Sequence, residues 1–192
     1  GKKVLIANPL GAVADSIFGL PHSSLGAELA WLGILCYTFQ LFFDFSGYSD
    51  MAIGLGRMLG FTWMENFNHP YIAQNITDFW RRWHISLSRF MREYVYIPLG
   101  GNRVTAWRGY LNLIIVFALS GIWHGANWTF LVWGLYHGLF IVLDKAGLAK
   151  ITERLPKIIN AAITFGLVMV GWVFFRSETI TQAGQFIKTM FG

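Results

Sequence analysis

The stretch LNLIIVFALSGIWHGANWTFLVWGLYHGLFIVL, residues 111–143, consists of two apolar runs separated by a short polar segment. As one straight helix from Tyr110 to Leu143 it would be about 50 Å long, whereas the hydrocarbon core of a bilayer is about 30 Å thick. We therefore predict a break between Gly121 and Asn127. A broken backbone at membrane depth is tolerated only inside protein or beside a water-filled cavity. The stretch thus predicts a membrane helix interrupted where chemistry can occur.

The composition is that of a membrane protein. Of the 192 residues, 55% are hydrophobic, 17% aromatic and only 13% charged, whereas about a quarter of a soluble domain is charged. We predict an all-α fold of polytopic transmembrane helices, with the lipid bilayer as a partner. The net charge of +5 comes from basic residues that flank apolar runs. It indicates orientation and headgroup contact rather than nucleic-acid binding, so no nucleic-acid partner is predicted.

Apolar runs and helix breakers give the expected order of elements. Residues 1–24 are expected to form short helical pieces or loops, with breaks at Asn8–Pro9 and Leu20–Pro21. The later elements are expected to be spans at Leu25–Phe43, Tyr110–Leu143 and Ile158–Phe175, a polar and aromatic connector at Phe61–Pro70, a basic loop at Asp144–Lys157 and a further amphipathic piece within 177–192. Basic residues on both sides of the broken span would lie in the cytoplasm under the positive-inside bias, which favours a hairpin over a single tilted crossing.

Residues Ile76–Ile97 follow the pattern of one amphipathic helix that lies in the membrane interface. The predicted apolar face contains Ile76, Phe79, Trp80, Trp83, Leu87, Phe90, Met91 and Tyr94, and the polar face contains Asp78, Arg81, Arg82, Arg89 and Arg92. The pattern places His84 on the flank between these faces. Asn75 or Thr77 is expected to cap the start of this helix.

His124, between the two apolar runs, is the first candidate for catalysis. Histidine takes and returns a proton near neutral pH, which suits a general base acting on a hydroxyl group. The alternative is a packing histidine bonded to a neighbouring carbonyl. On pattern alone, His84 favours contact with lipid headgroups over catalysis, and His137 favours packing over a place in the same cavity.

Two acidic residues and several absent patterns complete the survey. Asp44 and Asp50 could pair with arginines such as Arg57 or face a polar tunnel, and a structural ion pair or a helix cap is expected rather than catalysis. The histidine spacings match no metal-ligand pattern, so no metal site is predicted. The sequence contains no Gly-x-Ser-x-Gly elbow and no phosphate-binding loop, so nothing supports a hydrolase or an NTPase.

Four motifs occur in order: DFSGYSD at 44–50, DFWRRWHISLS at 78–88, YIPLGGNR at 96–103 and GIWHGANW at 121–128. From about Lys2 to Phe191 the chain resembles the membrane-bound O-acyltransferase (MBOAT) family. It is most similar to the branch of bacterial alginate O-acetyltransferase membrane subunits, and the D-alanyl transferases of teichoic acids are a more distant branch. The resemblance implies a helical core around a tunnel across the bilayer. His124 takes the position of the family's invariant histidine and His84 that of the second motif histidine.

The resemblance also sets an expectation about the extent of the protein. Residues 1–192 are expected to form a single membrane domain that is the C-terminal-half portion of a longer protein. The tunnel would be incomplete without the remainder. We therefore expect this piece alone to be inactive.

The function implied by the resemblance is O-acyl transfer at the bacterial inner membrane. The acyl donor would be an acetyl thioester such as acetyl-CoA on the cytoplasmic side, no cofactor would be bound, and the acceptor would be an exported polysaccharide such as alginate. His124 would act as general base or acyl relay, and His84 would orient the acyl group or assist proton transfer. Substrate binding is expected at Trp123, Asn127, Arg81 and Arg82, although lipid headgroups are the favoured ligands of the arginines.

Other functions stay open at this point. Extracytoplasmic polysaccharide-acetylation proteins are expected partners of the enzyme. Within the family, D-alanyl or another acyl group could be the one transferred. Outside it, the alternatives are a transporter-like subunit whose histidines relay protons and a scaffold subunit of an exopolysaccharide complex.

Overall fold

The computed structural model describes the backbone of residues 1–192 and every side chain except that of His22. The regular structure in this described part is helical, as the composition predicts. The chain divides into two compact units, Gly1–Glu65 with Arg176–Gly192, and Asn66–Phe175. The first unit contains η1 (Lys2–Ala7), α1 (Asn8–Phe18), η2 (His22–Ser24), α2 (Ala27–Met58) and α9 (Ile180–Phe191). The second contains η3 (Pro70–Ile72), α3 (Ile76–Arg82), α4 (Ile85–Met91), η4 (Arg92–Tyr96), α5 (Ala106–His124), α6 (Trp128–Leu143), η5 (Asp144–Leu148), α7 (Ala149–Thr152) and α8 (Lys157–Arg176) up to Phe175.

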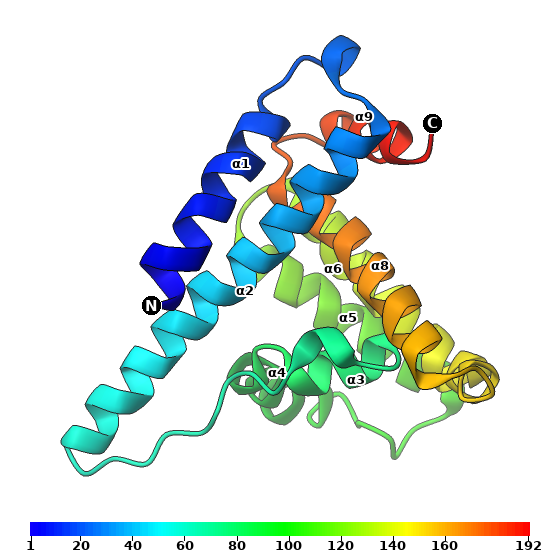
Figure 1. Ribbon diagram of the computed structural model, residues 1–192. Helices are drawn as coiled ribbons and strands as arrows, with labels where there is room; N and C mark the ends of the chain where they lie inside the picture. The colour runs from blue at the N-terminus through cyan, green and yellow to red at the C-terminus, as the bar shows by residue number, and fades with distance from the viewer. The chain divides into compact units, whose positions relative to one another are not determined.

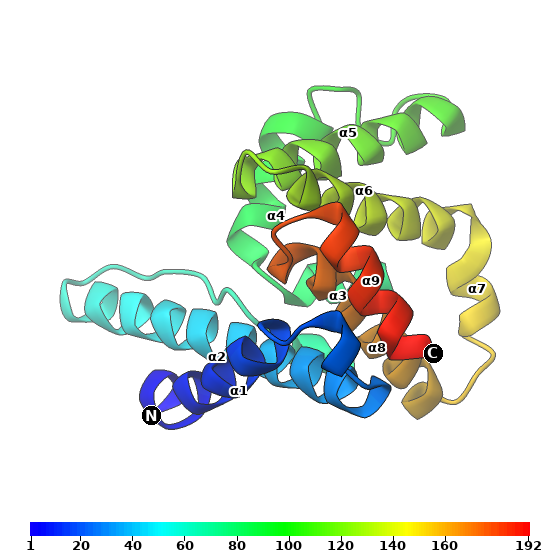
Figure 2. The ribbon, with the colours of Figure 1, turned by 90° about the horizontal axis from the view of Figure 1, so that it is seen from above.

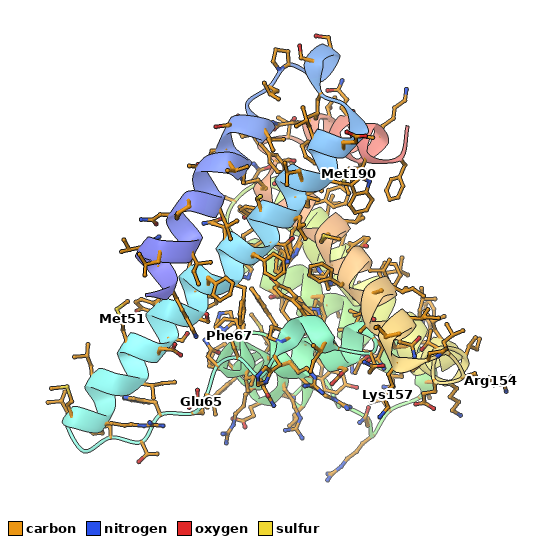
Figure 3. All side chains as sticks on the ribbon, viewed as in Figure 1. Met51, Glu65, Phe67, Arg154, Lys157 and Met190 are labelled. Carbon is orange, nitrogen blue, oxygen red and sulfur yellow. The ribbon has the colours of Figure 1, made fainter. Side chains whose placement is uncertain are left out.

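The first unit is built on the long helix α2, against which α1 and α9 pack (Figure 1). Phe18 of α1 stacks on Phe186 of α9 with ring centroids 4.2 Å apart. The indole N–H of Trp31 in α2 donates to the main-chain carbonyl of Met190, a residue of α9 labelled in Figure 3, at 2.8 Å. These contacts bury one face of α9 and confirm the amphipathic piece predicted within 177–192.

The break predicted at Asn8–Pro9 is wrong. η1 runs directly into α1, and Pro9 lies in the first turn of α1. Proline is tolerated there because its ring fits the helical backbone. The wider π-type turn upstream, in which the Asn8 N–H bonds to the Lys3 carbonyl, keeps the backbone bonded across the junction. The break predicted at Leu20–Pro21 is confirmed, since α1 ends at Phe18.

α2 continues well past Phe43, where the sequence indicated the end of the first apolar span. Its 32 residues correspond to a length of about 48 Å, which exceeds the bilayer core of about 30 Å. Near the end of α2, Trp63 of the following connector lies over Gly56, where a Cβ atom would collide with the indole ring. Because α2 extends to Met58, the segment that carries Asp44 and Asp50 is helical.

The lysines of η1 pair with the acidic residues of α2. Lys3 Nζ lies 2.8 Å from Asp44 Oδ2, and Lys2 Nζ lies 2.7 Å from Asp50 Oδ2. The prediction of structural ion pairs is confirmed. The candidate partner Arg57 is wrong, because Arg57 lies 3.7 Å from a glutamate of the connector instead. The cations come from η1, whose position against α2 could not be predicted from the sequence.

The second unit contains the α5–α6 hairpin that the sequence favoured. The helices lie side by side (Figure 2) and are joined by residues 125–127, inside the predicted break. The helices cross at glycines, which have no side chain. A Cβ on Gly121 would collide with the main-chain carbonyl of Phe130, and one on Gly134 with that of Phe117. Small residues of this kind let helix backbones approach closely in lipid. The hairpin is thus held by direct backbone contact.

The single amphipathic helix predicted for Ile76–Ile97 is wrong. The structure has α3, α4 and η4 instead, with an extended Trp83 (φ −106°, ψ 130°) and a left-handed His84 (φ 45°, ψ 54°) between α3 and α4. The backbone groups released by this break bond to the connector, because the Asn68 N–H donates to the Arg82 carbonyl at 2.9 Å. Apolar periodicity did not reveal the break, since the stabilising partner is distant in sequence.

Two smaller expectations about this segment have different outcomes. The capping prediction is confirmed for Asn75, whose Oδ1 accepts the Asp78 N–H at 2.7 Å. The predicted apolar face is only partly buried, because Phe90 and Tyr94 are exposed whereas Phe79 is fully buried. The turn of the chain at the break separates side chains that a single helix would have aligned.

The basic loop predicted for Asp144–Lys157 is largely helical, since η5 and α7 lie within it. Gly147 provides the bend inside η5 with a φ of 131°. Arg154 lies in the connection from α7 to α8, and Lys157 is the first residue of α8; both are labelled in Figure 3. Within the described residues, four helical segments are long and apolar enough to cross a membrane: Ala27–Met58, Ala106–His124, Trp128–Thr152 and Lys157–Arg176.

Alanine in place of Gly121 or Gly134 tests the backbone contact between α5 and α6. Each new methyl group meets main-chain atoms that cannot rotate away, and overpacking of this kind destabilises by about 1–3 kcal/mol. We expect the melting temperature of the purified protein in detergent to fall by about 2–4 °C for each kcal/mol. Gly166→Ala in α8 is the matched control, because a Cβ there meets no atom within 4 Å. Equal melting temperatures for Gly121→Ala and Gly166→Ala would contradict the contact.

Candidate active site

His124 is the last residue of α5, and the turn into α6 fixes its position. Asn127 caps α6, because its Oδ1 accepts the Thr129 N–H at 3.2 Å. Gly125 leaves room for the ring of Phe130, which a Cβ atom would meet. The tip of the hairpin therefore holds His124 through main-chain geometry and a helix cap.

The His124 imidazole is half-buried against aromatic rings. The ring centroids of Trp133 and Phe175 lie 5.0 and 5.2 Å away, and that of Phe130 lies 6.5 Å away. The fourth ring, that of Trp123, lies 4.9 Å away and belongs to a residue that is 60% exposed. His124 thus has an apolar wall on one side and an accessible neighbour on another.

His84 lies at the break between α3 and α4, and not on the flank of a continuous helix as the pattern indicated. Its left-handed backbone is uncommon for a residue with a Cβ and persists only where the surroundings impose it. The His84 ring centroid lies 6.3 Å from that of Trp123. Trp123 therefore neighbours both histidines, which come from segments far apart in the chain.

The environment keeps the His84 ring uncharged. Burial and, to a smaller extent, the neighbouring His124 lower the pKa of His84 to about 4. At neutral pH the ring is therefore a hydrogen-bonding base and not a cation. An uncharged imidazole gains little electrostatic attraction from a lipid phosphate.

The other predicted binding residues are spread over the second unit. Trp123 lies beside both histidines, as described above. The Asn127 oxygen serves as a helix cap. Arg82 Nε lies 2.8 Å from Asp78 Oδ1 in an ion pair. Arg81 is exposed and lines cavities whose walls include neither histidine.

Two adjoining cavities of about 170 and 730 Å³ lie among α3, η4, α5 and α6. The smaller one is mostly apolar, with a lining that includes Trp80, Leu87, Met91, Val116 and Phe117. The larger one is polar and contains charges of both signs, from Arg81, Arg92, Lys145, Asp78, Asp144 and Glu153. Arg81 and Arg92 line both cavities. Ser120 also lines the smaller one and lies about one helical turn before His124.

His137 is buried completely and is enclosed by aromatic rings. The ring centroids of Trp80 and Trp133 lie 5.2 and 5.4 Å from that of His137. Within the described part of the chain, neither nitrogen of this ring has a hydrogen-bonding partner. Trp133 stands between His137 and His124 and contacts both rings. This placement supports the packing interpretation of His137.

Sequence reasoning missed three residues that shape the site. Trp133 and Phe175 wall His124, but no spacing distinguishes them among the many aromatic residues of the apolar runs. Asn66 contacts His84 through its side-chain oxygen, and it was one polar residue among several in the connector. Among the residues with described side chains, no group of three or more His, Cys, Asp or Glu is placed to hold a metal ion.

Comparison with known proteins identifies the family to which the chain belongs. The family model "MBOAT, membrane-bound O-acyltransferase family" matches residues 27–176. The chain is 53% identical over 190 residues to the probable alginate O-acetylase AlgI of Azotobacter vinelandii, which is 99% of this chain and 38% of that protein. It is 50% identical to the peptidoglycan O-acetyltransferase of Helicobacter pylori over 100% of this chain and 37% of that protein. It is 33% identical to the teichoic acid D-alanyltransferase of Streptococcus thermophilus over 89% of this chain and 46% of that protein.

The matched relatives are longer than the chain. The chain spans about two fifths of the length of the first two of these relatives. The matched region contains both histidines, the hairpin and the break between α3 and α4.

The lowered pKa of His84 predicts a pH-dependent stability with a defined sign. The folded pKa of about 4 lies below the unfolded value of about 6.5, so the unfolded state takes up the proton first as the pH falls. The stability contributed by the neutral ring is present above about pH 6.5 and is lost between pH 6.5 and 4. We expect the melting temperature of the wild type, measured relative to His84→Gln, to fall across this window and to stay constant above pH 7. A difference that does not change between pH 7 and 4.5 would contradict the burial of a neutral ring.

Proposed function

Because the chain belongs to the membrane-bound O-acyltransferase family, we propose that it carries the catalytic histidines of an enzyme that transfers an acetyl group from a thioester to a polysaccharide hydroxyl group. The observation that supports this most directly is the meeting of His84 and His124 beside one exposed tryptophan. The family and the apolar helices make the protein a multi-pass membrane protein. We assign it to the bacterial inner membrane, where a cytoplasmic thioester and an exported polymer can be reached from opposite faces.

The proposed chemistry requires one base and one leaving thiol. His124 accepts the proton of the acceptor hydroxyl as its oxygen bonds to the thioester carbonyl carbon. The carbon–sulfur bond then breaks, and the imidazolium of His124 gives this proton to the leaving thiolate. The aromatic wall of Trp133 and Phe175 keeps competing water from one side of His124. His84, a neutral base at pH 7, orients the acyl group or assists the proton transfer.

The adjoining cavities support a thioester donor. The mostly apolar cavity of about 170 Å³ suits a narrow chain, and its lining includes Arg81 and Arg92 as well as Ser120 near His124. We assign acetyl-CoA as the donor, with its phosphates at the two arginines. The carboxylates that line the larger cavity offset part of the attraction between the arginines and a phosphate. Lipid headgroups are the competing ligands of the same arginines.

The relatives support acetyl as the transferred group. The proteins that are 50–53% identical carry the names probable alginate O-acetylase and peptidoglycan O-acetyltransferase, whereas the D-alanyltransferase is 33% identical. We therefore assign an exported glycan such as alginate as the acceptor. Extracytoplasmic polysaccharide-acetylation proteins are the proposed partners, because the acceptor and the donor lie on opposite sides of the bilayer.

Substitution of His124 tests the catalytic assignment. We expect His124→Ala in the whole protein to lower the acetyl content of the secreted polymer by at least about 100-fold, since loss of general base catalysis costs about 10²–10⁴ in rate. Membrane abundance is measured in the same cells. His137→Leu is the matched control, because it removes another buried histidine whose ring nitrogens have no partner among the described residues. We expect this control to keep acetylation.

The same assay separates the alternatives. Persisting acetylation in His124→Ala at normal abundance would overturn the catalytic role and favour a scaffold. If the wild type forms no acetyl product and His124→Ala abolishes D-alanyl esters instead, the result would favour the other branch of the family. A change in ion flux without any acyl product would favour a transporter.

Substitution of His84 distinguishes chemistry from anchoring. We expect His84→Ala to reduce turnover by at least about tenfold at unchanged abundance, because the ring belongs to the site rather than to the lipid surface. An equal loss of turnover and of membrane abundance would assign His84 to anchoring instead.

A further inference from the structure

We propose that Asn66 is a positioning residue for His84, whose side-chain oxygen fixes the imidazole tautomer that carries its hydrogen on Nδ1 and its lone pair on Nε2. The inference rests on the proposed function only in giving the Nε2 lone pair a part in acyl transfer. Neither the motifs nor the periodicity of the sequence indicate this residue.

Asn66 grips the break between α3 and α4 with both its side chain and its main chain. Its Oδ1 lies 3.1 Å from the Ser86 main-chain nitrogen, 3.0 Å from Ser86 Oγ and 3.3 Å from His84 Nδ1. Its main-chain carbonyl accepts the Ile85 N–H at 3.0 Å. One residue of the connector thus bonds to His84 at the break and to the first two residues of α4.

The Ser86 main chain identifies the atom that faces His84. A main-chain N–H can only donate, so the Asn66 atom 3.1 Å from it is the amide oxygen and not the amide nitrogen. An amide oxygen can only accept. His84 Nδ1, 3.3 Å from the same oxygen, therefore bonds to it only when Nδ1 carries the hydrogen. In the neutral ring the lone pair is then on Nε2.

The Ser86 hydroxyl is a neighbour that could favour the other tautomer. Its Oγ lies 3.3 Å from His84 Nδ1 and 3.0 Å from Asn66 Oδ1. If the hydroxyl donated to Nδ1, the lone pair of that nitrogen would face the amide oxygen, which is repulsive. The shorter contact to Asn66 also favours donation to the oxygen. Both donors therefore converge on Asn66.

A fixed tautomer matters because His84 stays neutral at pH 7. A neutral imidazole presents one donor and one acceptor, and the group bonded to the donor decides which nitrogen can accept. Asparagine or carboxylate groups orient catalytic imidazoles in this way in other sites. Asn66 determines, through His84, which atom can receive a proton or a hydrogen bond.

Nuclear magnetic resonance of the whole protein with ¹⁵N-labelled histidine tests the tautomer directly. The His84 signals are assigned by their loss in His84→Gln. We expect the wild type to show the hydrogen on Nδ1, and Asn66→Ala to show a mixture of both tautomers. A wild-type hydrogen on Nε2, or an unchanged tautomer in Asn66→Ala, would overturn the proposal.

Kinetics with a pH profile provide the second readout. Asn66→Ala is expected to lower kcat by about tenfold with less change in KM for the thioester. Asn66→Asp keeps an accepting oxygen, and its charge raises the pKa of His84 by about 1–3 units. The acid limb of the pH profile should move up by the same amount. An acid limb that does not move would contradict the contact between residues 66 and 84.

Asn68→Ala is the matched control for local structure. Asn68 also holds the break, but through its main-chain N–H and carbonyl, which bond to Arg82 and survive the substitution. We expect this variant to keep both the tautomer and kcat, and an equal loss in Asn68→Ala and Asn66→Ala would overturn the tautomer role. The two proposals fail separately. If Asn66→Ala leaves the tautomer unchanged while acetylation still depends on His124, only the role of Asn66 is rejected. If Asn66→Ala changes the tautomer while acetylation does not depend on His124, only the acetyl-transfer function is rejected.

Discussion

The contact between the backbones of α5 and α6 at Gly121 and Gly134 is the constraint on which the second unit depends. Lipid gives apolar helices little hydrophobic reason to associate, so association relies on close packing and polar contacts. Without side chains at the crossing, main-chain atoms of one helix rest on the other. The crossing brings Trp133 of α6 beside His124 at the end of α5. A wider hairpin would remove the aromatic wall from the proposed base.

Both histidines of the site occur where a helix stops. His124 ends α5 and His84 separates α3 from α4. Each break is stabilised by an asparagine: Asn127 caps α6, and Asn66 bonds to the residues of the other break. Unpaired main-chain groups are expensive in an apolar surrounding, so breaks persist only where such partners exist. His137, inside α6 with no break beside it, is instead sealed among aromatic rings.

The sequence predicted those features that depend on composition and on segment length. The broken span between Tyr110 and Leu143 followed from its length, and the helical class followed from the charge content. The break at His84 could not be predicted, because its stabilising bonds come from a connector whose own sequence is unremarkable in pattern. The role of Pro9 was misjudged because the π-type turn before it keeps the helix backbone hydrogen-bonded as far as Asn8. His124 was found from its place between two apolar runs, and the resemblance gave His84 its place in the site, whereas Asn66 required the fold.

A structure of the whole protein with a non-hydrolysable thioether analogue of acetyl-CoA would show whether His84 and His124 face one passage in which a thioester and an alcohol meet. We predict that the analogue's acyl group lies between the His84 and His124 rings, with Trp123 beside it. A carbonyl group bound elsewhere, or a His124 ring closed off from the analogue by lipid or aliphatic side chains, would contradict it.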